Sequence, residues 1–290
     1  MSEHGATGPL TAALLRDWPL PDRSGSKDER GGVLVLGGAR GTPGAAMLSG
    51  LAALRVGAGR LTLAVASSVS GQVAVAVPES GVLALPESSS GSVAGLPDDD
   101  AGELDRADVV LVGPGLDEPD GTRGLIEDVC AALDDQTPVV LDAFALGVLP
   151  QMTDARRALA GRLVLTPNGE EGSRLLDGDE RDPKEAAAAI ADRYGAVVAL
   201  SGHVAAPDGR SWQSASGYSG LGTSGSGDVL AGAVAGLAAS GTDLARATGW
   251  GVALHAGAGD RLAASVGPVG FLARELVDAL PHVLLEFQVT

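Results

Sequence analysis

Short apolar runs alternate with longer segments of helical character along most of this chain. Several runs are continuous, rich in valine and leucine, and end at glycine or a polar residue, as buried strands do. The expected strands cover residues 32–36, 61–66, 82–85, 107–112, 138–141, 162–165 and 196–200. The expected helices cover residues 43–56, 122–133, 169–176, 183–194, 226–239, 243–263 and 270–280. Strands that alternate with helices in this order indicate an α/β fold with a mostly parallel sheet.

Local signals set the boundaries of some of these elements. Thr42 and Pro43 are expected to open the helix over residues 43–56, with Thr42 as its cap and Pro43 in its first turn. Pro-Asp-Gly-Arg at 207–210 separates two short apolar runs, which predicts a β-hairpin.

Composition fits one large domain with a core of small aliphatic side chains. Of 290 residues, 45% are hydrophobic and 3% aromatic, so Ala, Val and Leu must fill the interior. We expect residues 1–30 to form a polar, loosely packed lead-in and residues 31–285 to form a single domain. The net charge of -17 argues against nucleic acid and anionic membranes as partners, but it leaves room for a local nucleotide site.

Targeting and redox features predict a cytoplasmic protein. No uninterrupted run of about 18 apolar residues suggests a membrane span. The first residues lack the pattern of a secretory signal. The chain has 1 Cys, which allows no internal disulfide and suits a reducing compartment. We expect this residue, Cys130, to lie in the core.

Functional or very small residues follow several of the expected strands. They are Gly37-Gly38, Gly113-Pro114-Gly115, Asp142 and Thr166-Pro167-Asn168. In an open parallel sheet, ligands bind outside the carboxyl ends of the strands. The sequence therefore predicts a single cleft formed by these strand ends.

The stretch over residues 217–237 is the strongest candidate for chemistry. Its first half is rich in Gly and small hydroxyl residues, and its second half has the character of a buried helix. Backbone N–H groups of such a loop and the first turn of the helix can bind an anion together. Asp228 stands at the junction, where a carboxylate can accept a proton or hold a metal ion. The alternative is a flexible linker before a helix, with Asp228 as an ordinary first-turn acid.

Familiar nucleotide and metal motifs are missing from the sequence. The dinucleotide fingerprint does not follow the first strand, and no lysine occupies a phosphate-binding P-loop. Any phosphate must therefore be held by backbone N–H groups, a helix N-terminus and Mg²⁺. The histidines share no ligand spacing, so we assign no metal ligands.

The remaining histidine, serine and aromatic side chains give weaker indications of a functional role. We expect His255 to be a packed or hydrogen-bonded core residue, and His203 to face the cleft. Ser226 has no visible base partner in the sequence. The larger aromatic side chains are expected to pack in the core; they are Trp212, Trp250 and Phe271.

These motifs resemble the ribokinase-like superfamily and, more narrowly, the ADP-dependent (S)-NAD(P)H-hydrate dehydratases. The resemblance runs from about residue 32 to residue 280. Gly-Ser-Gly-Asp-Val-Leu-Ala-Gly at 225–232 is the most specific segment for the superfamily, and Ala-Leu-Arg-Val-Gly-Ala-Gly at 53–59 points to the dehydratase branch. The other matching segments are 33–38, 44–46, 78–79, 113–116, 141–143 and 165–167, with Glu171.

The resemblance implies a three-layer α/β/α sandwich and a repair reaction on hydrated NADH or NADPH. In this family the ring hydroxyl is phosphorylated from ADP, or ATP, with Mg²⁺, and elimination of phosphate restores the cofactor. Asp228 would be the catalytic acid, with Gly225, Ser226 and Gly227 as the anion hole. The hydrated dinucleotide would contact Ala45, Gly113, Gly115, Asn168 and Asp228. The AMP part would contact Ser201, Gly202, His203, Val204, Ala205 and Gly227.

Three positions depart from the family pattern. Asn168 stands where the family has His, Phe144 replaces an acid, and Ser201 replaces a lysine. A ribokinase-like kinase for a small alcohol, of the thiazole or hydroxymethylpyrimidine type, and a non-catalytic nucleotide-binding relative are therefore the alternatives. The family also implies a homo-oligomer, either a dimer or a tetramer, whose partners are small nucleotides.

Overall fold

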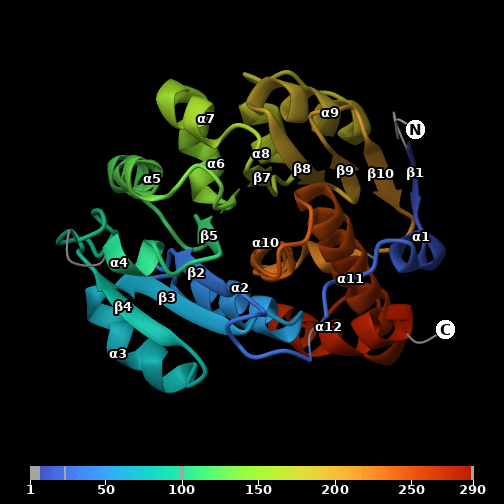
Figure 1. Cartoon of the computed structure of the whole chain (residues 1–290), viewed down its shortest axis with the longest axis horizontal. Helices are drawn as coiled ribbons and strands as arrows, with labels where there is room; N and C mark the ends of the chain where they lie inside the picture. Colours follow the sequence, from blue (N-terminus) through green and yellow to red (C-terminus); the bar gives the residue numbers. More distant parts are fainter. Residues whose placement is uncertain (1–6, 23, 98–100, 218, 289–290) are drawn as a thin grey trace.

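A single twisted sheet runs through the molecule. The computed structural model describes residues 7–22, 24–97, 101–217 and 219–288. Within these residues the sheet has 10 strands in the order β1-β10-β9-β8-β7-β6-β5-β2-β3-β4 (Figure 1). Only the pairs β8–β9 and β9–β10 are antiparallel among the pairings described. The prediction of a mostly parallel α/β sheet is confirmed.

The strands agree with the apolar runs of the sequence to within a few residues. Alternate side chains of β2 (Gly32–Leu36) point to opposite faces, so Val33 and Leu34 belong to separate apolar clusters. Since both faces are covered, the central strands are continuous apolar runs. The other strands are β1 (Thr7–Leu10), β3 (Arg60–Ala66), β4 (Gly81–Leu85), β5 (Val109–Val112), β6 (Val139–Leu141), β7 (Leu163–Leu165), β8 (Ala196–Leu200), β9 (His203–Ala205) and β10 (Ser211–Ser214).

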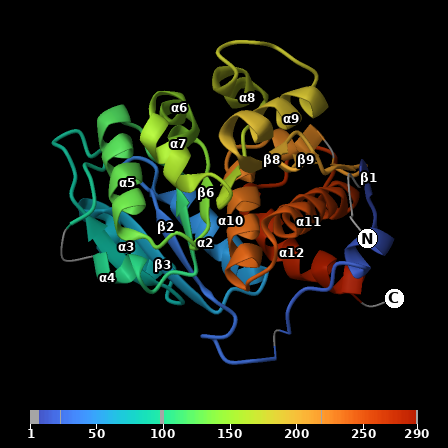
Figure 2. The same ribbon diagram turned by 45° about the horizontal axis from the view of Figure 1, so that its top comes forward.

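Helices cover the two faces of the sheet and complete a three-layer sandwich (Figure 2). One apolar cluster joins the sheet to α1 (Ala12–Arg16), α2 (Pro43–Arg55), α10 (Ser226–Ala239), α11 (Leu244–Ser265) and α12 (Ala273–Gln288). The other joins it to α5 (Pro119–Ala132), α6 (Phe144–Val148), α7 (Thr153–Leu159), α8 (Gly169–Leu175) and α9 (Pro183–Tyr194). Shorter elements are α3 (Ser67–Ala76), α4 (Ala101–Leu104) and the 3₁₀ turns η2 (Leu149–Gln151) and η3 (Ser219–Gly222).

Glycines let α10 lie very close to α2. A Cβ added at Gly232 would lie 2.0 Å from the carbonyl oxygen of Ser49, and one at Gly236 would lie 2.5 Å from that of Ala53. These contacts are to backbone atoms, which cannot move aside as a flexible side chain can. The buried second half of α10 is therefore fixed, and it holds the first turn of the helix in place.

Residues 7–18 pack against the rest of the protein, which corrects the sequence-based expectation of a loosely packed lead-in for this part of the chain. Strand β1 pairs in parallel with β10 at the edge of the sheet (Figure 1). Leu15 of α1 is fully buried, and Trp18 packs edge-on against Trp212 at 4.9 Å between ring centroids. The indole N–H of Trp250 donates to the carbonyl of Trp18. Residues 1–6 and 23 lie outside the described residues.

Replacing Thr11 with Ala tests whether this segment contributes to stability. Thr11 caps α1, because its hydroxyl accepts a hydrogen bond from the Leu14 N–H at 3.2 Å. Loss of this cap is expected to lower the free energy of unfolding by about 1 kcal/mol in a denaturant titration. Thr11→Ser keeps the oxygen and should restore most of it. Equal stability of Thr11→Ala and wild type would contradict a packed N-terminal segment.

Several boundaries differ from the sequence-based expectations. The hydroxyl of Thr42 does not cap α2 but donates to the carbonyl of Gly115 at 2.8 Å, because the two loops lie side by side. Residues 144–159, for which we expected no element, form α6, η2 and α7. Glu118 caps α5, so that helix begins before residue 122. The hairpin of β9 and β10 is confirmed.

Among the described residues, no helix has both the length and the apolar character that a membrane span requires.

Candidate active site

The carboxyl ends of the central strands meet at one edge of the sheet, as the sequence predicts. Hydrogen bonds tie the loops that follow them to one another. The N–H of Gly38 donates to the carbonyl of Pro114 at 2.8 Å, and the N–H of Ala39 donates to that of Gly115 at 2.8 Å. The N–H of Thr166 donates to the carbonyl of Leu141 at 3.3 Å. These loops therefore form one continuous rim.

Glycines allow the rim to close this tightly. A Cβ at Gly113, where φ is +128°, would lie 1.8 Å from the carbonyl oxygen of Asp142. A Cβ at Gly115, where φ is +75°, would lie 2.3 Å from the carbonyl oxygen of Thr42. Both glycines are thus required by the fold. Ala45, in the first turn of α2, lies beside Gly115 at the same rim.

The N-terminus of α10 has the features of an anion site. Gly225 adopts the left-handed conformation at φ +87° and turns the chain into the helix. The N–H of Ser226 donates to the carbonyl of Thr223 at 3.2 Å. By contrast, the N–H groups of Gly227 and Asp228 have no hydrogen-bond acceptor among the described residues. Unpaired first-turn N–H groups and the helix dipole both favour an anion here.

Ser226 has a partner that the sequence did not reveal. Its hydroxyl lies 2.9 Å from Nε2 of His255, which is 29 residues away on the neighbouring helix α11. Burial lowers the pKa of His255 to about 4, although an interaction with the Ser226 backbone opposes this shift. The imidazole is therefore neutral at pH 7 and fixes the side chain of Ser226. The expectation that Ser226 lacks a base partner was wrong; that of a hydrogen-bonded His255 is confirmed.

Three carboxyl groups interact electrostatically beside this helix. Burial, and next the charge of Glu171, raise the pKa of Asp228 to about 6. Burial, and next the charge of Asp228, raise the pKa of Asp142 to about 8. Asp142 is 4% exposed and accepts a hydrogen bond from the Thr166 hydroxyl at 2.7 Å. At pH 7 Asp142 is therefore mostly protonated, whereas Asp228 is mostly ionised and ready to accept a proton.

Asn168 and Glu171 form a reciprocal cap at the start of α8. The Glu171 N–H donates to Oδ1 of Asn168 at 2.9 Å, and the Asn168 N–H donates to Oε2 of Glu171 at 2.8 Å. Burial raises the pKa of Glu171. The sequence places Asp142 at the predicted cleft and Glu171 in a matching segment, but it gives neither residue a role in the site. An acid directly after a buried strand and an acid in a capping box are the signals that could have suggested such a role.

The proposed nucleotide residues lie on the turn between β8 and β9 and in β9 itself. Ser201 and Gly202 have positive φ values of +48° and +80° on this turn. Val204 and Ala205 belong to β9 and are buried.

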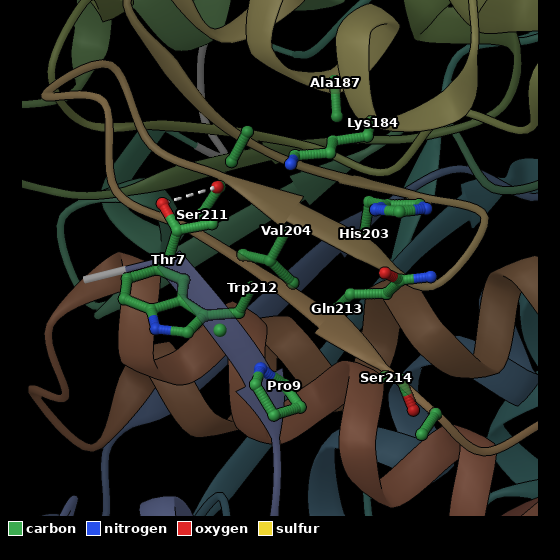
Figure 3. A pocket seen from close by; sticks show the side chains of 13 residues that line it. Thr7, Pro9, Lys184, Ala187, His203, Val204, Ser211, Trp212, Gln213 and Ser214 are labelled. Atoms are coloured by element: carbon green, nitrogen blue, oxygen red, sulfur yellow. Dashed lines mark hydrogen bonds between the residues drawn. The ribbon is translucent and has the colours of Figure 1, made fainter. Parts of the chain in front are cut away.

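The ring of His203 lies in a separate cavity of about 370 Å³ beside Lys184 and Gln213 (Figure 3). No residue of 225–228 lines this cavity. That His203 faces the cleft and contacts the AMP part stays a prediction.

No group of three or more His, Cys, Asp or Glu side chains that could hold a metal ion occurs in the part of the chain that the structure describes. A closed all-protein metal site is thus not present among these residues. Mg²⁺ commonly binds through one or two carboxylates together with substrate phosphates. The carboxyl groups beside α10 fit an ion that is held mainly by the phosphates of a bound nucleotide.

The chain is similar to known enzymes that act on NAD(P)H hydrate. The family model for NAD(P)H-hydrate dehydratase matches residues 33–282. The chain is 44% identical to the ADP-dependent (S)-NAD(P)H-hydrate dehydratase of Xanthomonas campestris pv. campestris, over 96% of this chain and 98% of that protein. It is 38% identical to the bifunctional NAD(P)H-hydrate repair enzyme of Moorella thermoacetica, of which it spans only 53%.

Solved structures agree with this likeness. ADP/ATP-dependent NAD(P)H-hydrate dehydratase from Bacillus subtilis, co-crystallised with ATP and Mg²⁺, superposes with a TM-score of 0.78 at 26% identity, over 97% of this chain and 99% of that chain. A hydroxyethylthiazole kinase from Pyrococcus horikoshii superposes with a TM-score of 0.61 at 19% identity, over 93% of this chain and 91% of that chain. The second likeness concerns the fold alone.

Proposed function

This chain belongs to the NAD(P)H-hydrate dehydratase family, and we propose that its Asp228 carboxylate activates the ring hydroxyl of hydrated NADH or NADPH for phosphorylation by ADP. One observation carries this proposal. A carboxylate with a pKa of about 6 stands in the first turn of α10, beside N–H groups that have no acceptor among the described residues. A base and an oxyanion site are thus adjacent.

Asp228 would act as base and then as acid in the reaction. Its carboxylate takes the proton of the ring hydroxyl as the hydroxyl oxygen attacks the terminal phosphorus of ADP, and AMP leaves. The C–O bond to the new phosphate then breaks with help from the ring nitrogen lone pair, and Asp228 returns the proton to the departing phosphate. Loss of a proton from the adjacent ring carbon restores the dihydronicotinamide. The products are the repaired cofactor, AMP and phosphate.

The backbone around Asp228 would supply the electrostatic part of catalysis. The N–H groups of Gly227 and Asp228, at the positive end of α10, would bind the transferring phosphoryl group. Mg²⁺ bound to the nucleotide phosphates would offset their remaining charge. Because these donors are fixed by the packing of α10 on α2, they need little reorganisation during transfer.

A single assay tests the proposed function against its alternatives. The protein is incubated with hydrated NADH, ADP and Mg²⁺, and the near-ultraviolet absorbance of the dihydronicotinamide is followed. We expect absorbance to recover with release of AMP and phosphate in equal amounts. A small-alcohol kinase would accumulate a phosphorylated product, and a non-catalytic relative would bind ADP without turnover. Absence of recovery with both ADP and ATP would rule out the dehydratase.

The pH dependence of activity should follow the ionisation of Asp228. Its raised pKa means that the carboxyl gains a proton below about pH 6, so the base is lost and kcat/KM should fall about tenfold per pH unit. Burial is the main cause of this raised pKa and the charge of Glu171 the next; Glu171→Gln removes that charge and keeps the capping box. The acid limb should therefore move to lower pH in this variant.

The Glu171→Gln variant also distinguishes the titration of Asp228 from the titration of the substrate phosphates. The phosphates of ADP titrate in the same range, but they titrate identically with both enzymes. An acid limb at the same pH in wild type and in Glu171→Gln would show that Asp228 is not the group observed.

The setting of the reaction is also a proposal. A homo-oligomer, dimer or tetramer, and a cytoplasmic location both fit an enzyme that repairs a soluble cofactor.

A further inference from the structure

A second cavity of about 520 Å³ lies between the helices that follow β5, β6 and β7. We propose that this distal cavity, lined among others by Leu116, Arg123, Phe144, Glu171 and Arg174, binds the adenosine end of the hydrated dinucleotide, and that its two arginines recognise the 2′-phosphate of hydrated NADPH. The inference rests on the proposed function and names the form of the substrate that the enzyme prefers.

The distal cavity shares Glu171 with the candidate active site and is lined by chain neighbours of its other residues. Glu171 lines the cavity, and its charge also acts on Asp228. Ala143 directly follows Asp142, and Leu116 directly follows the Gly113–Gly115 turn; both line the same cavity. The walls of the cavity are thus continuations of the rim around the carboxyl groups.

The order of strands places the distal cavity and the proposed AMP site at the ends of different strands. The turn at Ser201 and Gly202, which is proposed to contact the AMP part, follows β8. The distal cavity lies beyond the ends of β5, β6 and β7. ADP must approach the anion site while the nicotinamide ring is bound at Asp228. With ADP on the β8 side, the remainder of the dinucleotide has to leave the ring on the β5–β6 side, toward the distal cavity.

The cavity has the chemistry of a phosphorylated adenosine site. Arg123 is held from two directions, by Asp120 at 2.7 Å and by Gln151 at 2.9 Å. Arg174 pairs with Glu170 on the same helix. Both arginines remain partly exposed, at 32% and 58%, so these ion pairs are weak and a phosphate dianion can take over the guanidinium groups.

The apolar part of the cavity suits a base. Phe144 and Leu116 present an aromatic ring and an aliphatic side chain, on which adenine can stack. The phenyl ring of Phe144 is uncharged, so it does not repel a phosphate bound by Arg123 and Arg174.

Arg123→Gln and Arg174→Gln test the proposal. For each enzyme, kcat/KM is measured with hydrated NADPH and with hydrated NADH at saturating ADP. We expect wild type to prefer hydrated NADPH. Each variant should lose about tenfold or more with hydrated NADPH and change less than about twofold with hydrated NADH. Arg157→Gln is the matched control, since Arg157 forms an exposed ion pair of the same i,i+3 spacing with Asp154 on α7.

The other outcomes overturn the proposal. Equal losses with both substrates would place the arginines at the shared pyrophosphate or in a structural role, and unchanged kinetics would exclude the cavity. If wild type is inactive on both hydrates, the proposed function fails instead. In that case, calorimetry with NADP⁺ and NAD⁺ still tests the cavity. Only a 2′-phosphate site would make Arg123→Gln weaken the binding of NADP⁺ and leave the binding of NAD⁺ unchanged.

Discussion

Replacing Asp228 with Asn is expected to lower kcat by roughly a hundredfold to ten-thousandfold, while the affinity for ADP stays within a few fold. The amide cannot accept the hydroxyl proton. The backbone donors of Gly227 and of residue 228 itself are unchanged, so the phosphates keep their binding site. Dehydration is measured by absorbance recovery, and ADP affinity by calorimetry.

An exposed acid provides the control for this variant. Asp154 is 99% exposed on α7 and pairs with Arg157 rather than with the carboxyl cluster, so Asp154→Asn should leave both kcat and ADP affinity unchanged. Near-normal turnover by Asp228→Asn would show that another group is the base. A large loss of ADP affinity would mean instead that the side chain of Asp228 mainly binds the nucleotide or its Mg²⁺.

Two glycines five positions apart on α10 should respond in opposite ways to the same substitution. A Cβ at Gly232 would lie 2.0 Å from the Ser49 carbonyl oxygen, so Gly232→Ala must push α10 and α2 apart. We expect the free energy of unfolding to fall by at least about 2 kcal/mol. A Cβ at Gly227 meets nothing within 4 Å, so Gly227→Ala should fold with equal or slightly higher stability.

The two glycine variants should rank in the opposite order for activity, because Gly227→Ala should lose turnover and Gly232→Ala should keep it. The methyl group of Gly227→Ala would stand beside the N–H groups that receive the phosphoryl group, so kcat should fall at least about tenfold in a stable protein. Gly232→Ala should retain its activity at temperatures where it remains folded. If Gly227→Ala is fully active, phosphate does not approach this face of the helix. If Gly232→Ala is as stable as wild type, α2 and α10 have more room than their backbone distances indicate.

The regular elements could be predicted from the sequence because each is fixed by a local pattern. The runs at 32–36 and 196–200 are buried on both faces, and their Val and Leu content is enough to identify strands. Gly195 ends α9 in the left-handed conformation, as glycine does after many helices. The N-terminal segment was misjudged because its apolar side chains, among them the buried Leu15 and the partly buried Trp18, are covered only by contact with distant elements.

The sequence alone determined the fold class and Asp228 as the residue to test. Repeating apolar runs and a Gly-rich loop before a buried helix are local features, and local sequence is sufficient to specify them. The tertiary structure decided which groups act on Asp228. Glu171 is 57 positions before it in the numbering, and Asp142 is farther still.

His255 reaches Ser226 only because α11 packs against α10. The charge, burial and hydrogen bonds of these groups depend on distances in space, so no pattern along the chain can supply them.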